Sequence, residues 1–154
     1  MKLNYLLIPL AVFAVGAWGS FITNGGLGWY SKIKLPSYTP AGSVIGTVWT
    51  VIFILTMISV LIVWNRHFDQ KNFWLIIILF AINGGLNIFW SYLFFGLHLL
   101  GPAAFEAGLL GLSVIALVIL IWPFSLAAAI LLLPYAGWVS FAAYLTYTIW
   151  NLNR

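Results

Sequence analysis

The sequence predicts an all-α integral membrane protein, a single domain built as a five-transmembrane-helix bundle. Of its 154 residues, 64% are hydrophobic and 5% are charged, and a soluble domain of this size cannot bury so much apolar surface. Apolar runs of about 20 residues mark membrane-spanning helices, and such runs make up most of the chain. The main expected partner of the protein surface is therefore the lipid bilayer.

The first three expected spans are separated by two segments of different character. The first span covers residues 5–23, and its start resembles a signal peptide whose apolar core is unusually long. The second covers residues 42–64 and the third residues 73–95, joined by the short charged segment 65–72. Residues 24–41 form the longest loop, and its glycines, prolines, lysines and aromatic residues indicate more than a passive linker.

The last two spans come from one nearly uncharged run that is too long for a single crossing. Proline cannot continue a helix without losing a hydrogen bond, so the break at residues 122–125 divides this run. The fourth span is expected at residues 102–121 and the fifth at residues 125–150, with a kink at Pro134.

Charge and reactive residue types exclude several classes of function. The net charge of +4 comes from six scattered basic residues against two acidic ones, which indicates loops at a membrane surface and no nucleic-acid partner. The chain has no cysteine and only two isolated histidines, so we expect neither thiolate chemistry nor a metal site. No catalytic constellation is visible.

The orientation of the chain in the membrane stays open, because the basic residues divide equally between the two sides. Lys2, Arg66 and Lys71 fall on one side, and Lys32, Lys34 and Arg154 fall on the other.

The third span carries a polar and aromatic face. Its members follow the spacing i, i+4, i+7, i+8 and i+11, which places them on one side of a helix: Asn83, Asn87, Trp90, Ser91 and Phe94. Amides inside a lipid-spanning helix are costly unless they find partners. This face is therefore expected to look at protein or at a ligand.

Unusual residues on four spans fall at similar depths. With a rise of about 1.5 Å per residue, they lie roughly 6 to 18 Å below the side that carries the long loop. They are Trp49 on the second span, Asn87 and Trp90 on the third, Glu106 on the fourth, and Trp138 and Ala142 on the fifth. Their convergence predicts one pocket beneath residues 24–41.

Each of these features also has a structural interpretation. Tryptophans mark membrane interfaces, and Asn83 and Asn87 could simply bond neighbouring helices. Glu106 is expected in the first turn of its helix, where the dipole or the headgroup region favours an anion. The small-residue patterns Gly42-x-x-x-Gly46 and Ala81-x-x-x-Gly85 allow close packing, either within the chain or in a homodimer.

Four segments resemble the tryptophan-rich sensory protein / translocator protein family, whose mitochondrial members are also called peripheral benzodiazepine receptors. They are WYSKIKLPSYTPAG (29–42), GTVWTVIF (46–53), LNIFWSYLFFG (86–96) and PYAGWVSFAAYLTYTIW (134–150). With the five-span layout, the resemblance covers nearly the whole chain. It differs from the family pattern at Leu35, Tyr38, Ala41 and Thr146, and the sterol motif near Tyr147 is not intact.

The resemblance implies a pocket that opens toward the long loop, in a multi-pass protein of a bacterial cell membrane. It implies no cofactor, but binding of porphyrins such as protoporphyrin IX and of isoquinoline-carboxamide or benzodiazepine drugs. The matching ligand-binding positions are Tyr30, Pro36, Trp49, Phe53, Asn87, Trp90, Ser91, Trp138 and Ala142, and Glu106 fits an acidic position of the fourth span.

Four functions compete. A receptor or sensor for tetrapyrrole-like ligands uses tryptophan faces for stacking and amides for hydrogen bonds. A tetrapyrrole or sterol transporter is expected to contain inverted repeats and broken helices, which are not evident. The resemblance also implies a third function, light- and oxygen-dependent degradation of protoporphyrin, with Trp49 and Trp138 as the oxidisable residues. A purely structural packing protein does not account for the convergent polar face.

Overall fold

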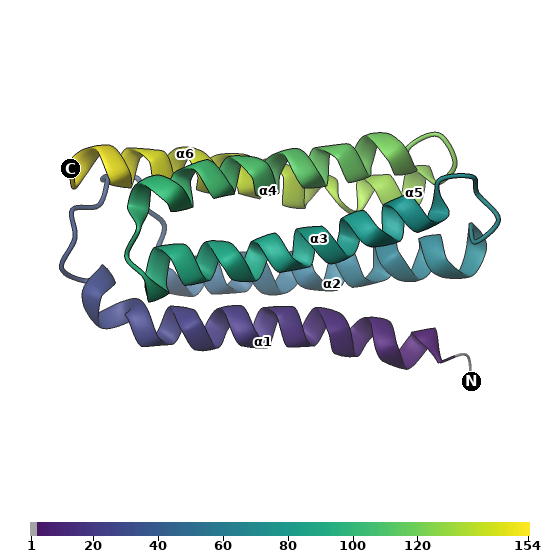
Figure 1. The fold of residues 1–154 in the computed structure, drawn as a ribbon, viewed down its shortest axis with the longest axis horizontal. Coiled ribbons are helices and arrows are strands. Elements are labelled where there is room, and N and C mark those ends of the chain that lie inside the picture. Colours follow the sequence, from purple (N-terminus) through teal and green to yellow (C-terminus); the bar gives the residue numbers. More distant parts are fainter. Residues whose placement is uncertain (1–2) are drawn as a thin grey trace.

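A computed structural model describes residues 3–154, which form membrane-length helical segments lying side by side (Figure 1). The elements are α1 Asn4–Tyr30, α2 Gly42–Arg66, α3 Phe73–Ser91, the π-helix η1 Tyr92–Gly96, α4 Leu100–Ile121, α5 Leu126–Ile130 and α6 Leu133–Leu152. Five segments are long and apolar enough to cross a membrane, and no strand occurs in the described range. The predicted all-α architecture with five spans is therefore confirmed.

The first helix is longer than the sequence predicts. It was expected to end at residue 23, but α1 continues to Tyr30, so the loop begins at residue 31 and not at 24. The glycines of this stretch suggested a loop because glycine weakens a helix by about 1 kcal/mol. Here Gly26 lets α1 approach η1, since a Cβ on it would lie 2.6 Å from the backbone oxygen of Phe95. Tertiary contact outweighs local propensity.

The third span ends in a π-helix that was not expected. The backbone N–H of Leu97 donates to the oxygen of Tyr92 at 2.8 Å, the i→i+5 bond of a π turn. Both phenylalanines of this turn pack against the end of α1: the Tyr30 ring lies 6.0 Å from Phe94 and 5.5 Å from Phe95 between centroids. The π turn thus anchors the last turn of α1.

The fifth span is broken where a kink was predicted. Residues 131–132 form a turn, and α6 begins at Leu133 with Pro134 in its first turn. Proline lacks an N–H and clashes with the carbonyl four residues earlier, so it fits a helix start better than a helix interior. The break frees the Ala128 carbonyl, which accepts a 2.9 Å hydrogen bond from Ser59 Oγ of α2. A neighbouring helix thus satisfies backbone that water cannot reach.

Two hydrophobic clusters hold the bundle together. The larger contains Val63, Phe73, Ile121 and Leu132, near the end where α2 meets α3, and the smaller contains Leu93, Phe94, Ala103, Leu145 and Ile149, near the loop between α1 and α2. The outer faces are also apolar, with exposed side chains such as Phe13, Phe21, Phe105, Leu112 and Ile119. Such an exterior suits contact with lipid.

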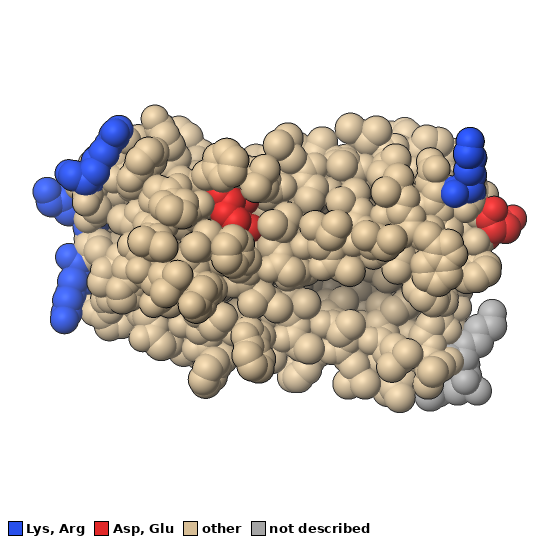
Figure 2. Space-filling model, in the orientation of Figure 1, with Lys and Arg blue, Asp and Glu red and all other residues tan. Residues whose placement is uncertain are grey.

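Basic residues lie at the two ends of the molecule, as Figure 2 shows. Lys2, one of the six basic residues counted in predicting the membrane orientation, lies outside the described residues. On the lipid-facing side of α3, Ala81 and Gly85 are both exposed, so the homodimer remains a prediction.

Candidate ligand-binding site

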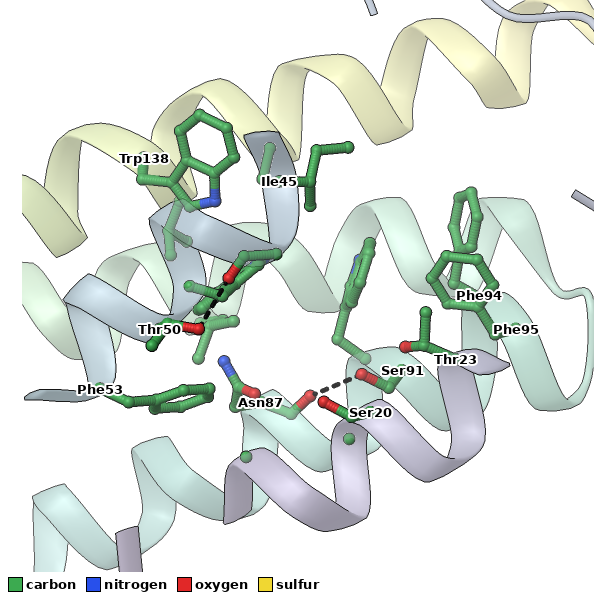
Figure 3. A pocket seen from close by; sticks show the side chains of 18 of the residues that line it. Ser20, Thr23, Ile45, Thr50, Phe53, Asn87, Ser91, Phe94, Phe95 and Trp138 are labelled. Carbon is green, nitrogen blue, oxygen red and sulfur yellow. Dashed lines mark hydrogen bonds between the residues drawn. The ribbon is translucent and has the colours of Figure 1, made fainter. Parts of the chain in front are cut away.

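One cavity of about 850 Å³ lies among α1, α2, α3, η1, α4 and α6. Its volume is within the range of small-molecule sites, about 300–1,000 Å³. Figure 3 shows side chains from several helices pointing into this space, with Phe94 and Phe95 at one side and Trp138 at another. The bundle therefore leaves room for a ligand between its helices.

Eight of the ten predicted site residues line this cavity: Tyr30, Trp49, Phe53, Asn87, Trp90, Ser91, Trp138 and Ala142. They include all the residues that were predicted to converge at similar depths except Glu106. The structure thus brings residues from four spans together, and their contact with a ligand remains a prediction.

Pro36 does not line the cavity, and neither does any other residue of the loop 31–41. The loop instead binds the end of α6. Asn153 holds the backbone of Lys34 from both sides, with Oδ1 accepting from its N–H at 2.9 Å and Nδ2 donating to its carbonyl at 2.9 Å. The Tyr38 hydroxyl bonds Thr148 Oγ1 at 3.1 Å. Pro36, predicted as a ligand-binding residue of the lid, thus lies in a loop fastened at one end of the bundle, and its contact with a ligand remains a prediction.

Glu106 also lies outside the cavity lining, although its neighbour Ala107 belongs to it. Because α4 begins at Leu100, Glu106 sits in the second turn and not in the first, where the helix dipole favours an anion. Its side chain is 3% exposed, and neither carboxyl oxygen has a hydrogen-bond partner within residues 3–154. The predicted roles as a dipole partner or headgroup contact are wrong, because neighbouring helices cover this position.

The polar residues of the third span form two groups: some bond neighbouring helices, and others line the cavity. Asn83 is buried away from the cavity, where Nδ2 donates to Ser113 Oγ at 2.8 Å and Oδ1 accepts from the Tyr135 hydroxyl at 2.9 Å. Asn87 lines the cavity, and its Nδ2 lies 3.5 Å from the same hydroxyl. Ser91 Oγ donates to the Asn87 carbonyl oxygen at 3.4 Å (Figure 3). The two amides therefore have different surroundings despite their equivalent spacing.

Two indole N–H groups of the lining have no acceptor among residues 3–154. Trp90 Nε1 and Trp138 Nε1 are buried, and neither finds a partner in the described part of the chain. The Trp90 ring stacks on Phe94, with centroids 5.2 Å apart, and Trp49 packs beside Phe53 at 5.7 Å. The site thus combines aromatic walls with hydrogen-bond donors that an acceptor on a ligand could satisfy.

Sequence reasoning missed the contribution of α1 and of the first turns of α2. Small residues of these helices line the cavity: Gly16, Gly19, Ser20, Thr23, Gly42, Gly46 and Thr50. A Cβ on Gly42 or Gly46 would meet nothing within 4 Å, so this pair does not serve close packing within the chain. The small-residue spacing at 16, 20 and 23 was the signal that could have identified the α1 wall.

The chain is similar to one family of membrane proteins over nearly its whole length. The TspO/MBR family model matches residues 7–151. Among the relatives, the tryptophan-rich protein TspO of Archaeoglobus fulgidus is 34% identical over 146 residues, which cover 94% of this chain and 93% of that protein. The protein of the same name from Bacillus cereus is 36% identical over 126 residues, 81% and 80% of the two chains. The human translocator protein is 28% identical over 156 residues, 99% of this chain and 89% of its own.

Proposed function

The chain belongs to the TspO/MBR family of multi-pass membrane proteins, and from that premise we propose that it is a membrane receptor for porphyrin-like and benzodiazepine-type aromatic ligands. The cavity between α1, α2, α3 and α6 is the proposed binding site. The ligand enters with its flat ring system against the tryptophans and its oxygen atoms toward the buried N–H groups.

The observation that carries the proposal is a cavity whose aromatic walls contain unpaired donors. Trp90 and Trp138 keep buried indole N–H groups with no acceptor in the described chain. Leaving such a group unpaired costs about 1–3 kcal/mol, and a carbonyl or carboxylate oxygen on a ligand recovers that cost. Trp49 adds a large aromatic face. Protoporphyrin IX and isoquinoline carboxamides have both features, a flat ring system and acceptor oxygens.

Titration with protoporphyrin IX in the dark tests this proposal. Purified protein in detergent should show saturable quenching of tryptophan fluorescence. Trp138→Phe should weaken binding, because phenylalanine keeps an aromatic face but loses area and the N–H. Trp74→Phe is the matched control, since Trp74 is 60% exposed and lies outside the cavity. Non-saturable quenching, or equal affinities in the two variants, would move the site elsewhere.

A second candidate function is light- and oxygen-dependent degradation of bound protoporphyrin. The observation in its favour is that Trp49 and Trp138, both readily oxidised, line the cavity that would hold the porphyrin. Under illumination in air, the receptor proposal expects porphyrin absorbance to decay no faster than with an unrelated membrane protein. Faster decay that disappears in Trp49→Phe or Trp138→Phe, while binding survives, supports degradation.

A further inference from the structure

Four buried side chains form a continuous hydrogen-bonded relay that ends in the cavity. Ser113 Oγ of α4 lies 2.7 Å from the Leu110 carbonyl oxygen, and Asn83 Nδ2 of α3 lies 2.8 Å from Ser113 Oγ. Asn83 Oδ1 is 2.9 Å from the Tyr135 hydroxyl of α6, which is 3.5 Å from Asn87 Nδ2. Of the four, only Asn87 lines the cavity.

The direction of every bond in the relay follows from its first member. The Leu110 carbonyl can only accept, so the Ser113 hydroxyl gives it its single hydrogen and must accept from Asn83 Nδ2. Asn83 therefore presents its oxygen to Tyr135, which donates its own single hydrogen there. The Tyr135 oxygen is left as an acceptor, and Asn87 must meet it with its amide nitrogen.

This chain of bonds opposes rotation of the Asn87 amide. If the amide turned over, its oxygen would face the Tyr135 oxygen, whose hydrogen is already committed to Asn83. Two acceptors would then meet at a buried site, since Asn87 is 7% and Tyr135 2% exposed. Two buried acceptors that face each other leave both oxygens unpaired, and each unpaired group costs about 1–3 kcal/mol. The orientation of the cavity amide is thus decided by a carbonyl on another helix.

The remaining N–H hydrogen of Asn87 is then free for a ligand. In Figure 3 the amide nitrogen of Asn87 points toward the side of the cavity where Thr50 and Trp138 lie. Its oxygen faces α1, where a Cβ on Gly19 would approach it to 3.9 Å.

We propose that Ser113, Asn83 and Tyr135 are positioning residues that hold Asn87 with its N–H toward the cavity, so that the site selects ligands carrying a hydrogen-bond acceptor at that point. This inference rests on the proposed function. None of the three positioning residues lines the cavity. The Tyr135 hydroxyl reaches the lining through the Asn87 amide, while the Tyr135 ring packs against Trp49 with centroids 5.9 Å apart, a contact that a phenylalanine ring keeps.

A matched pair of neutral ligands separates positioning from a merely structural role. Benzoylisoquinoline carries a carbonyl where benzylisoquinoline carries a methylene, and the two are otherwise alike. The unaltered protein should prefer the ketone by roughly three- to tenfold, the size of one net hydrogen bond. Tyr135→Phe removes only the hydroxyl. It should reduce that preference to about one while the affinity for benzylisoquinoline changes less than about twofold.

Ser113→Ala provides a second variant at the far end of the relay. Without the Ser113 hydroxyl, the side-chain amide of Asn83 can rotate by half a turn. The preference for the ketone should therefore also fall in this variant, although no cavity-lining residue has been changed. Tyr147→Phe, on the exposed side of α6, is the control and should keep the preference. Circular dichroism and detergent gel filtration establish that each variant is folded.

The outcomes separate the two proposals. If the unaltered protein binds neither isoquinoline nor protoporphyrin IX, the proposed function fails. If it binds the ligands but shows no preference for the ketone, or if both relay variants retain the preference, the positioning inference is overturned. An equal loss of affinity for both ligands also overturns it, because a structural role alone predicts that result.

Discussion

Two adjacent glycines in the last turns of α1 allow a sharp test of how this helix meets the rest of the bundle. Gly25 and Gly26 are both helical, but a Cβ on Gly25 meets nothing within 4 Å. A Cβ on Gly26 would lie 2.6 Å from the Phe95 carbonyl oxygen, 2.7 Å from Phe95 Cβ and 3.0 Å from its Cα. Two of these three atoms are backbone, so they cannot swing aside.

The expected effects have opposite signs. Gly25→Ala should stabilise the protein by about 0.5–1 kcal/mol, the gain in helix propensity from glycine to alanine. Gly26→Ala receives the same gain, but the overlap forces α1 and η1 apart, and overpacking of this kind costs typically 1–3 kcal/mol. We expect a net loss of about 0.5–2 kcal/mol. The difference between the two variants isolates the contact with Phe95 from the propensity that they share.

The assay is reversible unfolding in mixed detergent, followed by circular dichroism, with both variants compared with the unaltered protein. Equal stabilisation by the two substitutions would show that α1 does not approach η1 at Gly26. Absence of any gain for Gly25→Ala would indicate that residues 24–30 are not a stable helix, which is what the sequence alone predicts.

Three further predictions concern the cavity, the broken span and the loop. Ala142→Leu fills space in the cavity and should raise the Kd for protoporphyrin IX tenfold or more, about 1.4 kcal/mol. Ala143→Leu, outside the lining, should leave the Kd unchanged. A folded Ala142→Leu protein with the same Kd as the unaltered protein would contradict the site. Ser59→Ala leaves the Ala128 carbonyl unpaired and should destabilise the protein by about 1–3 kcal/mol in the same unfolding assay. Asn153→Ala releases the backbone of Lys34 and should speed proteolysis within residues 31–41; an unchanged cleavage rate would show that other contacts hold the loop.

Much of the site could be predicted from the sequence because depth and helical face are local properties. Hydropathy defines where the chain crosses the bilayer, since each crossing must satisfy its own backbone hydrogen bonds. Within a span, the fixed rise and period of a helix determine which residues share a face and a depth. Trp49, Asn87, Trp90 and Trp138 were placed together in this way, and all of them line one cavity.

Only the tertiary structure decided which neighbour each residue meets, because that depends on how one helix is turned against another. Gly26 lies in a helix that packs directly against Phe95, a contact that local propensity does not reveal. Pro36 lies outside the cavity lining because Asn153 holds its loop at the end of α6. Asn83 and Asn87 are one turn apart on the same face, yet one bonds Ser113 inside the bundle and the other reaches the cavity. The sequence determined that this chain is a five-span membrane protein with a polar helix face, whereas packing across helices decided which part of that face a ligand can contact.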